Sequence, residues 1–315
     1  MRGSFAKAEP VKGRIVFMSN QFELTEHVPG TGGIPFAVEK NGIKRWYDPG
    51  SNDGTCLYEN GKVKVLYKSL YWPTWSPDGK RLATVTAGNQ GKNLTLVELD
   101  KGSMTKVKVK NYIMDISWFP DGQRIAFVGH DEGAGYKTPK NVFAYDIKTG
   151  EETQMTSFEN PKETMLGLDV SPDGRKIIFD QGRGPGQEGD WWLYLLDVET
   201  KEITQLVKYG HSPKWSPDGK KIVYSGNYFD PKIQQERSEI LIYDFETQQM
   251  TPVTYSDAVK TEPCWSPDGK QILFVQWEGE GKSLQVINVD GTNQRTVVPA
   301  QNYPGNDISN PDWAS

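Results

Sequence analysis

A five-residue phrase that contains Pro-Asp-Gly recurs five times along this chain of 315 residues. The copies lie 43 to 52 residues apart and begin at Trp75, Trp118, Val170, Trp215 and Trp265. A sixth, incomplete copy is Asn310-Pro311-Asp312-Trp313, whose tryptophan stands 48 residues after Trp265. Repeats with this period are typical of solenoids and propellers, so this feature constrains the fold more strongly than any other.

The phrase has the chemistry of a tight hairpin turn. Proline fixes the backbone of the first central position, aspartate suits the second, and glycine accepts the positive φ that follows. An apolar run follows each turn, at residues 82–85, 125–128, 177–179, 222–224 and 272–275. These runs hardly alternate, which indicates strands covered on both faces. With a third strand after a polar loop, as at 141–146, and a fourth that ends each repeat, the pattern predicts an all-β propeller of four-stranded antiparallel blades.

The start of the chain predicts that there are six blades. Residues 14–20 resemble the second-strand segment 221–227, but no first strand precedes them. We expect residues 309–313 to supply it, so that the C-terminal strand joins the N-terminal blade and closes the ring. The first blade, about residues 11–70, is long and contains two Asn-Gly turn signals. They predict an inserted hairpin at about residues 34–47.

Composition limits the domain organisation and the partners. We expect a leader-like or tag-like segment at residues 1–10, followed by a single propeller at residues 11–315. No stretch of 18 apolar residues occurs, which predicts no membrane span. The chain has 36 Lys and Arg against 41 Asp and Glu, a net charge of −5 without a basic patch, which does not favour nucleic acid as a partner. Cys56 and Cys264 are expected to be two buried thiols rather than a disulfide.

The repeats resemble those of TolB-type propellers, also called WD40-like or PD40 repeats. Their hallmark, Pro-x-Trp-Ser-Pro-Asp-Gly-Lys followed by an apolar strand, is matched in full at residues 73–80, 213–220 and 263–270. Two copies depart from it, because Phe119 replaces the serine in one and Val170 replaces the tryptophan in another. The resemblance covers nearly the whole chain, without the amino-terminal domain of TolB. It implies an exported six-bladed scaffold, periplasmic or otherwise extracytoplasmic, that binds other proteins, as TolB binds an outer-membrane lipoprotein over the propeller's mouth.

Candidate binding residues lie on one predicted face of the ring. In a propeller, the loops between second and third strands and the linkers between blades emerge on the same side, and recognition residues concentrate on such loops. Aromatic rings beside carboxylates there resemble a surface for a peptide or a sugar. The alternative is that several rings, Trp192 above all, begin a third strand and pack between blades. The candidates are His130, Asp131, Tyr136, Arg183, Trp191, His211, Tyr228, Phe229, Trp277 and Glu278, with Asp115, Glu262 and Asp307 expected near the same mouth.

The sequence assigns no catalytic residue, metal or cofactor. It has no Gly-x-Ser-x-Gly elbow, and its glycine-rich segment at 182–189 precedes no helix that could receive a phosphate. No His-x3-His spacing occurs among the three histidines. The favoured hypothesis is therefore a non-enzymatic module that binds a protein or peptide through the loop face and central channel. The alternative is a carbohydrate-binding propeller or a carbohydrate-active enzyme similar to oligogalacturonate lyases, whose histidine-rich metal site three scattered histidines match poorly.

Overall fold

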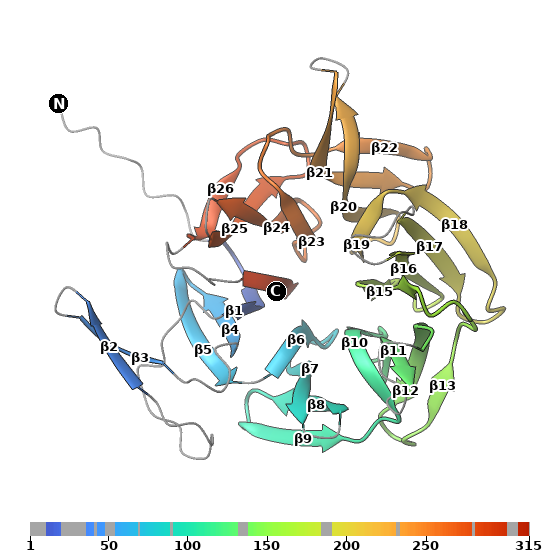
Figure 1. Ribbon diagram of the computed structural model, residues 1–315, viewed down its shortest axis with the longest axis horizontal. Coiled ribbons are helices and arrows are strands. Elements are labelled where there is room, and N and C mark those ends of the chain that lie inside the picture. Colours follow the sequence, from blue (N-terminus) through green and yellow to red (C-terminus); the bar gives the residue numbers. More distant parts are fainter. Residues whose placement is uncertain are drawn as a thin grey trace.

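Six antiparallel sheets surround a central axis, which confirms the predicted six-bladed β-propeller (Figure 1). The computed structural model describes residues 11–19, 36–40, 43–47, 54–68, 70–88, 91–131, 138–183, 191–230, 234–278, 281–300 and 308–314. Every regular element within these ranges is a β-strand. We number the sheets as blades 1 to 6 around the ring, starting with the blade that contains β1.

The first three blades follow the order of the chain, except for one strand of blade 1. From the axis outward, blade 1 consists of β27 (Ile308–Ala314), β1 (Arg14–Ser19), β4 (Gly54–Glu59) and β5 (Lys62–Lys68). Blade 2 consists of β6 (Leu70–Trp75), β7 (Arg81–Gly88), β8 (Gly91–Glu98) and β9 (Ser103–Val107). Blade 3 consists of β10 (Asn111–Trp118), β11 (Arg124–Asp131), β12 (Asn141–Asp146) and β13 (Glu152–Gln154).

The other three blades repeat this plan with local variations. Blade 4 has an interrupted inner edge, and it consists of β14 (Glu163–Thr164), β15 (Leu168–Val170), β16 (Lys176–Arg183), β17 (Trp192–Asp197) and β18 (Ile203–Lys208). Blade 5 consists of β19 (Gly210–Trp215), the long pair β20 (Lys221–Asp230) and β21 (Gln235–Asp244), and β22 (Gln249–Pro252). Blade 6 consists of β23 (Lys260–Trp265), β24 (Gln271–Glu278), β25 (Gly281–Asn288) and β26 (Arg295–Val298).

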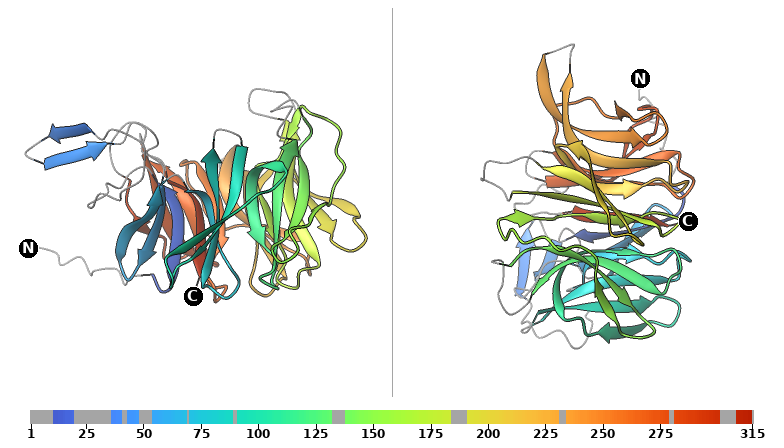
Figure 2. Two further views of the ribbon diagram at one scale, coloured as in Figure 1. Left: turned by 90° about the horizontal axis from the view of Figure 1, so that it is seen from below. Right: turned by 90° about the vertical axis from the view of Figure 1, so that its right-hand side faces the viewer.

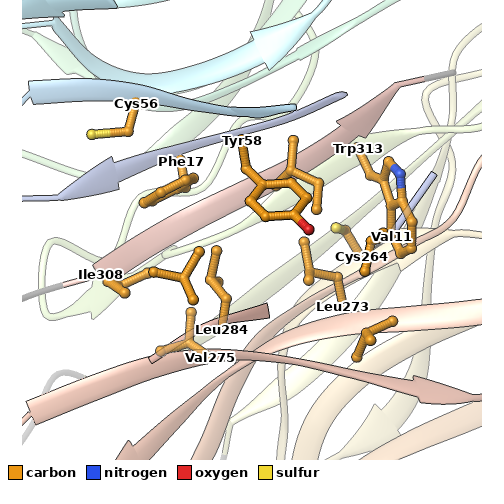
Figure 3. Packing of buried hydrophobic residues seen from close by; sticks show 13 residues of the cluster. Val11, Phe17, Cys56, Tyr58, Cys264, Leu273, Val275, Leu284, Ile308 and Trp313 are labelled. Carbon is orange, nitrogen blue, oxygen red and sulfur yellow. The ribbon is translucent and has the colours of Figure 1, made fainter. Parts of the chain in front are cut away.

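Blade 1 closes the ring as the sequence predicts. The C-terminal strand β27 pairs antiparallel with β1, and Trp313 lies opposite Ile15. The indole Nε1–H of Trp313 donates to the carbonyl of Lys12 at 3.0 Å. Phe17 and Trp313 share a buried cluster with both cysteines, which are free thiols (Figure 3). Residues from the two ends of the chain therefore form one core.

The remaining core is divided among the contacts between blades. Six buried clusters are found in the described part of the chain, and each joins two neighbouring blades. Both faces of the second strands are covered, as Ile125, Ala126, Phe127 and Val128 show with no exposed surface. This agrees with the predicted lack of alternation. Each of the larger side chains, those of Ile125, Phe127 and Val128, contributes roughly 1.5–3 kcal/mol of transfer free energy when it is fully buried.

The Pro-Asp-Gly turns form one face of the ring and use the same bonds in four blades. In blade 5, Ser216 Oγ lies 2.6 Å from Asp218 Oδ1 and accepts the Lys221 N–H at 2.9 Å, while Gly219 adopts φ 70°. Blade 3 has Phe119 in place of the serine. There the carboxylate of Asp121 accepts the Arg124 N–H and Nε–H, and the Arg124 guanidinium lies 4.2 Å above the Phe119 ring. The guanidinium of Arg124 thus takes the place of the serine hydroxyl as the side-chain donor to the turn carboxylate.

Two hairpins vary the ring. The strands β2 (Phe36–Lys40) and β3 (Ile43–Tyr47) pair only with each other among the described strands, within the segment where the sequence predicts an insertion. They stand apart from the blades in Figures 1 and 2, and the C-terminus lies on the opposite side of the ring in the left-hand view of Figure 2. The β20–β21 hairpin projects beyond its neighbours in the right-hand view of Figure 2. No helix long and apolar enough to cross a membrane is present in the described ranges.

Candidate functional site

Four inner strands carry the same backbone irregularity near one end of the central channel. Trp72, Ser212, Glu262 and Asn310 each precede a proline and have φ between 49° and 52°. Strand pairing shifts register at each of these points. A positive φ is unfavourable for residues with a Cβ, and it persists only where the surrounding structure enforces it. The bulges turn these four residues toward the mouth of the channel.

A cavity of about 640 Å³ opens at this mouth, and we call it the funnel. Every blade contributes to its lining. The contributing positions near the inner edge are Trp72, Met114, Leu166, Ser212, Glu262 and Asn310, which we call the rim residues. Its volume falls within the range of roughly 300–1,000 Å³ that is common for ligand sites.

The funnel has two chemically different arcs. The apolar arc comes from blades 2 to 4 and consists of Trp72, Tyr112, Met114, Met165 and Leu166. The polar arc comes from blades 5, 6 and 1 and consists of His211, Ser212, Ser225, Asn227, Ser238, Thr261, Glu262 and Asn310. Leu166 is half exposed at 50%. A ligand in the funnel would therefore meet apolar side chains on one side and hydrogen-bonding groups on the other.

Hydrogen bonds hold neighbouring rim residues in place. The buried carboxylate of Asp180 accepts the backbone N–H groups of Leu166 at 2.6 Å and Ser212 at 2.9 Å, which joins blades 4 and 5. The Glu262 carboxylate accepts the Asn310 N–H at 2.5 Å, which joins blades 6 and 1. Rim positions fixed in this way lose little conformational entropy when a ligand binds.

A narrower cavity of about 50 Å³, which we call the throat, lies next to the funnel and shares five of its lining residues. It adds three charged side chains, Asp115, Lys214 and Asp312. The Asp312 carboxylate accepts the Trp75 N–H at 2.7 Å, and Asp115 accepts the Leu168 N–H at 2.9 Å. These two carboxylates therefore join β27 to β6 and β10 to β15, which are inner strands of neighbouring blades.

Burial and charge shift the pKa values around the throat. Burial raises the pKa of Asp115 and of Asp180 to about 6, despite hydrogen bonds that act in the other direction. Burial alone would lower the pKa of Lys214, but the carboxylates led by Asp169, 3.9 Å away, raise it above its ordinary value. Burial lowers the pKa of His211, which favours its neutral imidazole at neutral pH.

Three of the predicted site residues lie at or behind the funnel wall. His211 is part of the lining, and the Trp191 ring lies 4.6 Å from its imidazole. Gly182 permits this arrangement, since a Cβ there would lie 2.6 Å from the Trp191 ring. His130 is buried, and its ring stacks at 4.8 Å on Tyr112 of the apolar arc. Trp191 and His130 therefore support lining residues.

Most of the other predicted residues lie outside the funnel or have side chains outside the described part of the chain. Asp131 is exposed at the end of β11, and Trp277 is 49% exposed beneath Lys282, whose Nζ lies 4.5 Å from the ring centroid. Neither lines the funnel. Four others lie at or near the ends of strands, and only their backbones are described: Arg183, Tyr228, Phe229 and Glu278. Tyr136 and Asp307 lie outside the described residues, whereas Asp115 and Glu262 line the throat near the mouth where they were expected.

Sequence reasoning missed most of the lining, including Trp72, Tyr112, Met114, Met165, Leu166 and Asn310. A signal for part of it was present. In four copies of the repeat the rim residue stands immediately before the proline of Pro-x-Trp, and its identity changes from Trp72 to Ser212, Glu262 and Asn310. A position that varies inside an otherwise constant phrase indicates a residue whose side chain the fold does not require.

The fold and the funnel define a closed six-bladed β-propeller with a lined mouth. The sequence matches the TolB beta propeller domain family, PD40, over residues 62–229, and the chain belongs to this family. It is 24% identical over 250 residues to the Tol-Pal system protein TolB of Francisella tularensis subsp. mediasiatica, covering 77% of this chain and 53% of that protein. An uncharacterized protein of Agrobacterium fabrum is 28% identical over 174 residues, covering 54% and 56%. The chain spans about half the length of these curated relatives.

Solved structures share the fold. TolB from Acinetobacter baumannii superposes with a TM-score of 0.67 at 19% identity, covering 96% of this chain and 66% of that one. An oligogalacturonate lyase in complex with manganese reaches a TM-score of 0.52 at 14% identity, covering 84% and 72%. In the part of this chain that the structure describes, no group of three or more His, Cys, Asp or Glu side chains is arranged to hold a metal ion.

Proposed function

We propose that this chain is a non-enzymatic binding module that captures a peptide segment of a partner protein in the funnel. One observation carries the proposal: every blade of the ring contributes a side chain to a single cavity of about 640 Å³. Strands of six sheets converge there, so the site exists only in the closed propeller. Its geometry depends on the whole fold rather than on one loop.

The lining suits a peptide. Met114, which is partly exposed, lines the apolar arc together with the aromatic rings of Trp72 and Tyr112. Methionine adapts its shape to varied apolar partners, and aromatic rings supply large contact areas. The polar arc offers hydroxyl and amide groups for the backbone of an extended segment. Trp277 and the other exposed loop residues would then contribute contacts outside the funnel.

The family relationship supports a location outside the cytoplasm. Relatives are named as Tol-Pal system proteins, and the repeats of this chain are of the same type. We propose that this propeller likewise acts as an extracytoplasmic, periplasmic scaffold for protein partners. Fold alone does not establish a shared partner, so the proposal rests on the funnel of this chain.

Site-specific photocrosslinking tests the proposal. A benzoylphenylalanine at position 166 should crosslink a discrete partner in envelope extracts, and mass spectrometry should identify the same partner segment in repeated experiments. The matched control is position 250, because Met250 is similarly exposed at 47% but lies on the outer strand β22. Equal crosslinking from both positions would contradict the proposal. Binding of uronate oligosaccharides at position 166 without a protein crosslink would favour the carbohydrate alternative.

A further inference from the structure

The two arcs of the funnel face each other across the channel. Blade 6 lies opposite blade 3 in the ring (Figure 1). Glu262, on β23 of the polar arc, is therefore across the channel from Met114, on β10 of the apolar arc. By the same geometry, Leu166 lies across from Asn310, and Trp72 across from Ser212. An occupant of the funnel therefore meets different chemistry on its two sides.

The charge of the lining is strongly biased. Among the residues that the structure describes, Glu262 is the acidic residue of the funnel lining, and the throat adds Asp115 and Asp312 against one cation, Lys214. Lys214 Nζ donates to the Leu168 carbonyl at 3.1 Å and lies 3.9 Å from Asp169, which lines neither cavity. The carboxylates of Asp169, Asp115 and Asp312 all act on this one cation, so it is shared among three carboxylates and the lining keeps an excess of negative charge. A cleft with an excess of one charge attracts ligand groups of the opposite charge.

The shape of the two cavities selects among cations. The throat, at about 50 Å³, accommodates a group of roughly the size of a water molecule or two, such as a primary ammonium. A guanidinium is planar and larger, with a rigid fork of donors. A lysine side chain combines a compact head with an apolar stem that can lie along apolar surface. Here the stem would pass Trp72 and Leu166, which line both cavities.

We propose that the funnel selects a peptide segment that presents apolar side chains to blades 2 to 4 and a lysine to Glu262 and the throat. This inference rests on the proposed function and specifies its ligand. Two independent features support it: the apolar arc, which requires an apolar partner face, and the charge of the opposite arc and throat. The partner is therefore an amphipathic segment with a defined orientation in the ring.

Panning a random 12-residue phage-displayed peptide library on the folded chain tests this inference. On the wild-type chain, enriched peptides should combine a lysine with apolar residues. On a Glu262→Lys variant, acidic residues should replace the lysine. The affinity of one synthetic enriched peptide should fall about 10-fold or more when its lysine is changed to norleucine, since a charge pair in a partly desolvated site is being broken.

A double-mutant cycle separates this contact from a general loss of binding. Glu262→Gln keeps an acceptor for the Asn310 N–H, so the melting temperature should be nearly unchanged. It should weaken the lysine peptide several-fold and the norleucine peptide hardly at all. Equal weakening of both peptides, or no enrichment of lysine, would overturn the inference.

Leu166→Ala distinguishes that failure from failure of the proposed function. If the enriched peptides lack lysine but lose affinity in Leu166→Ala, the funnel binds peptides and only the lysine inference is wrong. If the enriched peptides bind Leu166→Ala and wild type equally, or no peptide is enriched, the proposed function fails and the inference fails with it.

Discussion

The backbone adopts positive φ at both ends of the channel, but different residue types occupy these positions at the two ends. On the turn face, the positive φ values of 63° to 72° in the Pro-Asp-Gly turns all fall on glycine. At the funnel, φ values of 49° to 52° fall on tryptophan, serine, glutamate and asparagine. Glycine adopts this conformation without steric cost, whereas residues with a Cβ do not. The funnel therefore keeps side chains where glycine would be more favourable, which indicates that the side chains themselves are needed there.

The residues at the two ends of the channel also differ in how similar they are from one blade to the next. Each turn on one face reproduces nearly the same set of side chains, because each must form the same hydrogen bonds. At the funnel, the position before the proline of Pro-x-Trp holds a different residue in each of the four blades that have this motif. The repeated residues are thus those that the ring needs in order to fold, and the variable residues are those that we propose to recognise an asymmetric ligand.

Breaking the ring closure should have the largest effect on stability. Trp313 is 8% exposed, packs in the cluster between blades 6 and 1, and donates to the Lys12 carbonyl. Trp313→Ala should lower the free energy of unfolding by about 3–5 kcal/mol, as for other buried tryptophans. Urea denaturation followed by fluorescence or circular dichroism measures this change. A loss below about 1 kcal/mol would mean that the closure contributes little to the ring.

Carboxylates at the two ends should respond to pH with opposite signs. Asp115 and Asp180 have folded-state pKa values near 6, above their ordinary 3.8, so their contribution to stability is fully present below pH 3.8 and is lost as pH rises through 6. Turn aspartates such as Asp218 have lowered pKa values because a serine hydroxyl donates to them, and their contribution is lost as pH falls below 3.8. His211, with its lowered pKa, destabilises the fold as pH falls below 6.5.

We therefore expect maximal stability between about pH 4 and 6, with a gain on the order of 2–3 kcal/mol relative to pH 7. Denaturation midpoints across this range measure it. Asp115→Asn should flatten the slope between pH 4 and 7, and His211→Asn should steepen it. A stability that falls steadily from pH 7 to pH 4 would contradict the assignment of raised pKa values to the throat.

Removing one turn hydroxyl should have a moderate effect. Ser216 Oγ interacts with Asp218 and accepts the Lys221 N–H, so Ser216→Ala should cost about 1–2 kcal/mol. Ligand affinity should not change, because the turn lies on the opposite face from the funnel. Chemical denaturation and titration with an enriched peptide measure the two effects separately. A loss of peptide affinity without a loss of stability would contradict the assignment of the turn face to folding and of the funnel face to binding.

Relieving strain at the funnel should have the smallest effect. Ser212 has φ 49°, and Ser212→Gly should change stability by less than about 1 kcal/mol, with relief of strain opposing the greater freedom of the unfolded chain. Peptide affinity should decrease because the bulge becomes less rigid. Thermal unfolding and calorimetric titration can be carried out on the same sample. A marked destabilisation would show that the serine side chain has a structural role instead.

The fold could be predicted from sequence because turn chemistry and strand burial are local properties. The phrase around Trp215 determines a turn, and residues 222–224 determine a strand buried on both faces. The funnel could not be predicted in the same way. Leu166 and Glu262 meet at one mouth only because the ring closes, and Met114 lies on the inner strand β10, which has no proline of the Pro-x-Trp motif to mark its rim residue. Of the loop residues expected to bind, His211 lines the cavity, because its linker enters an inner strand directly.

The central claim is that the funnel binds a peptide through side chains that the fold does not require. The direct measurement is the dissociation constant of one enriched 12-residue peptide for wild type, Leu166→Ala and Met250→Ala, with melting temperatures for all three. We predict at least 10-fold weaker binding for Leu166→Ala, which corresponds to about 1.4 kcal/mol, and no change for Met250→Ala. All three melting temperatures should agree within about 2 °C. Unchanged affinity in Leu166→Ala would contradict the account.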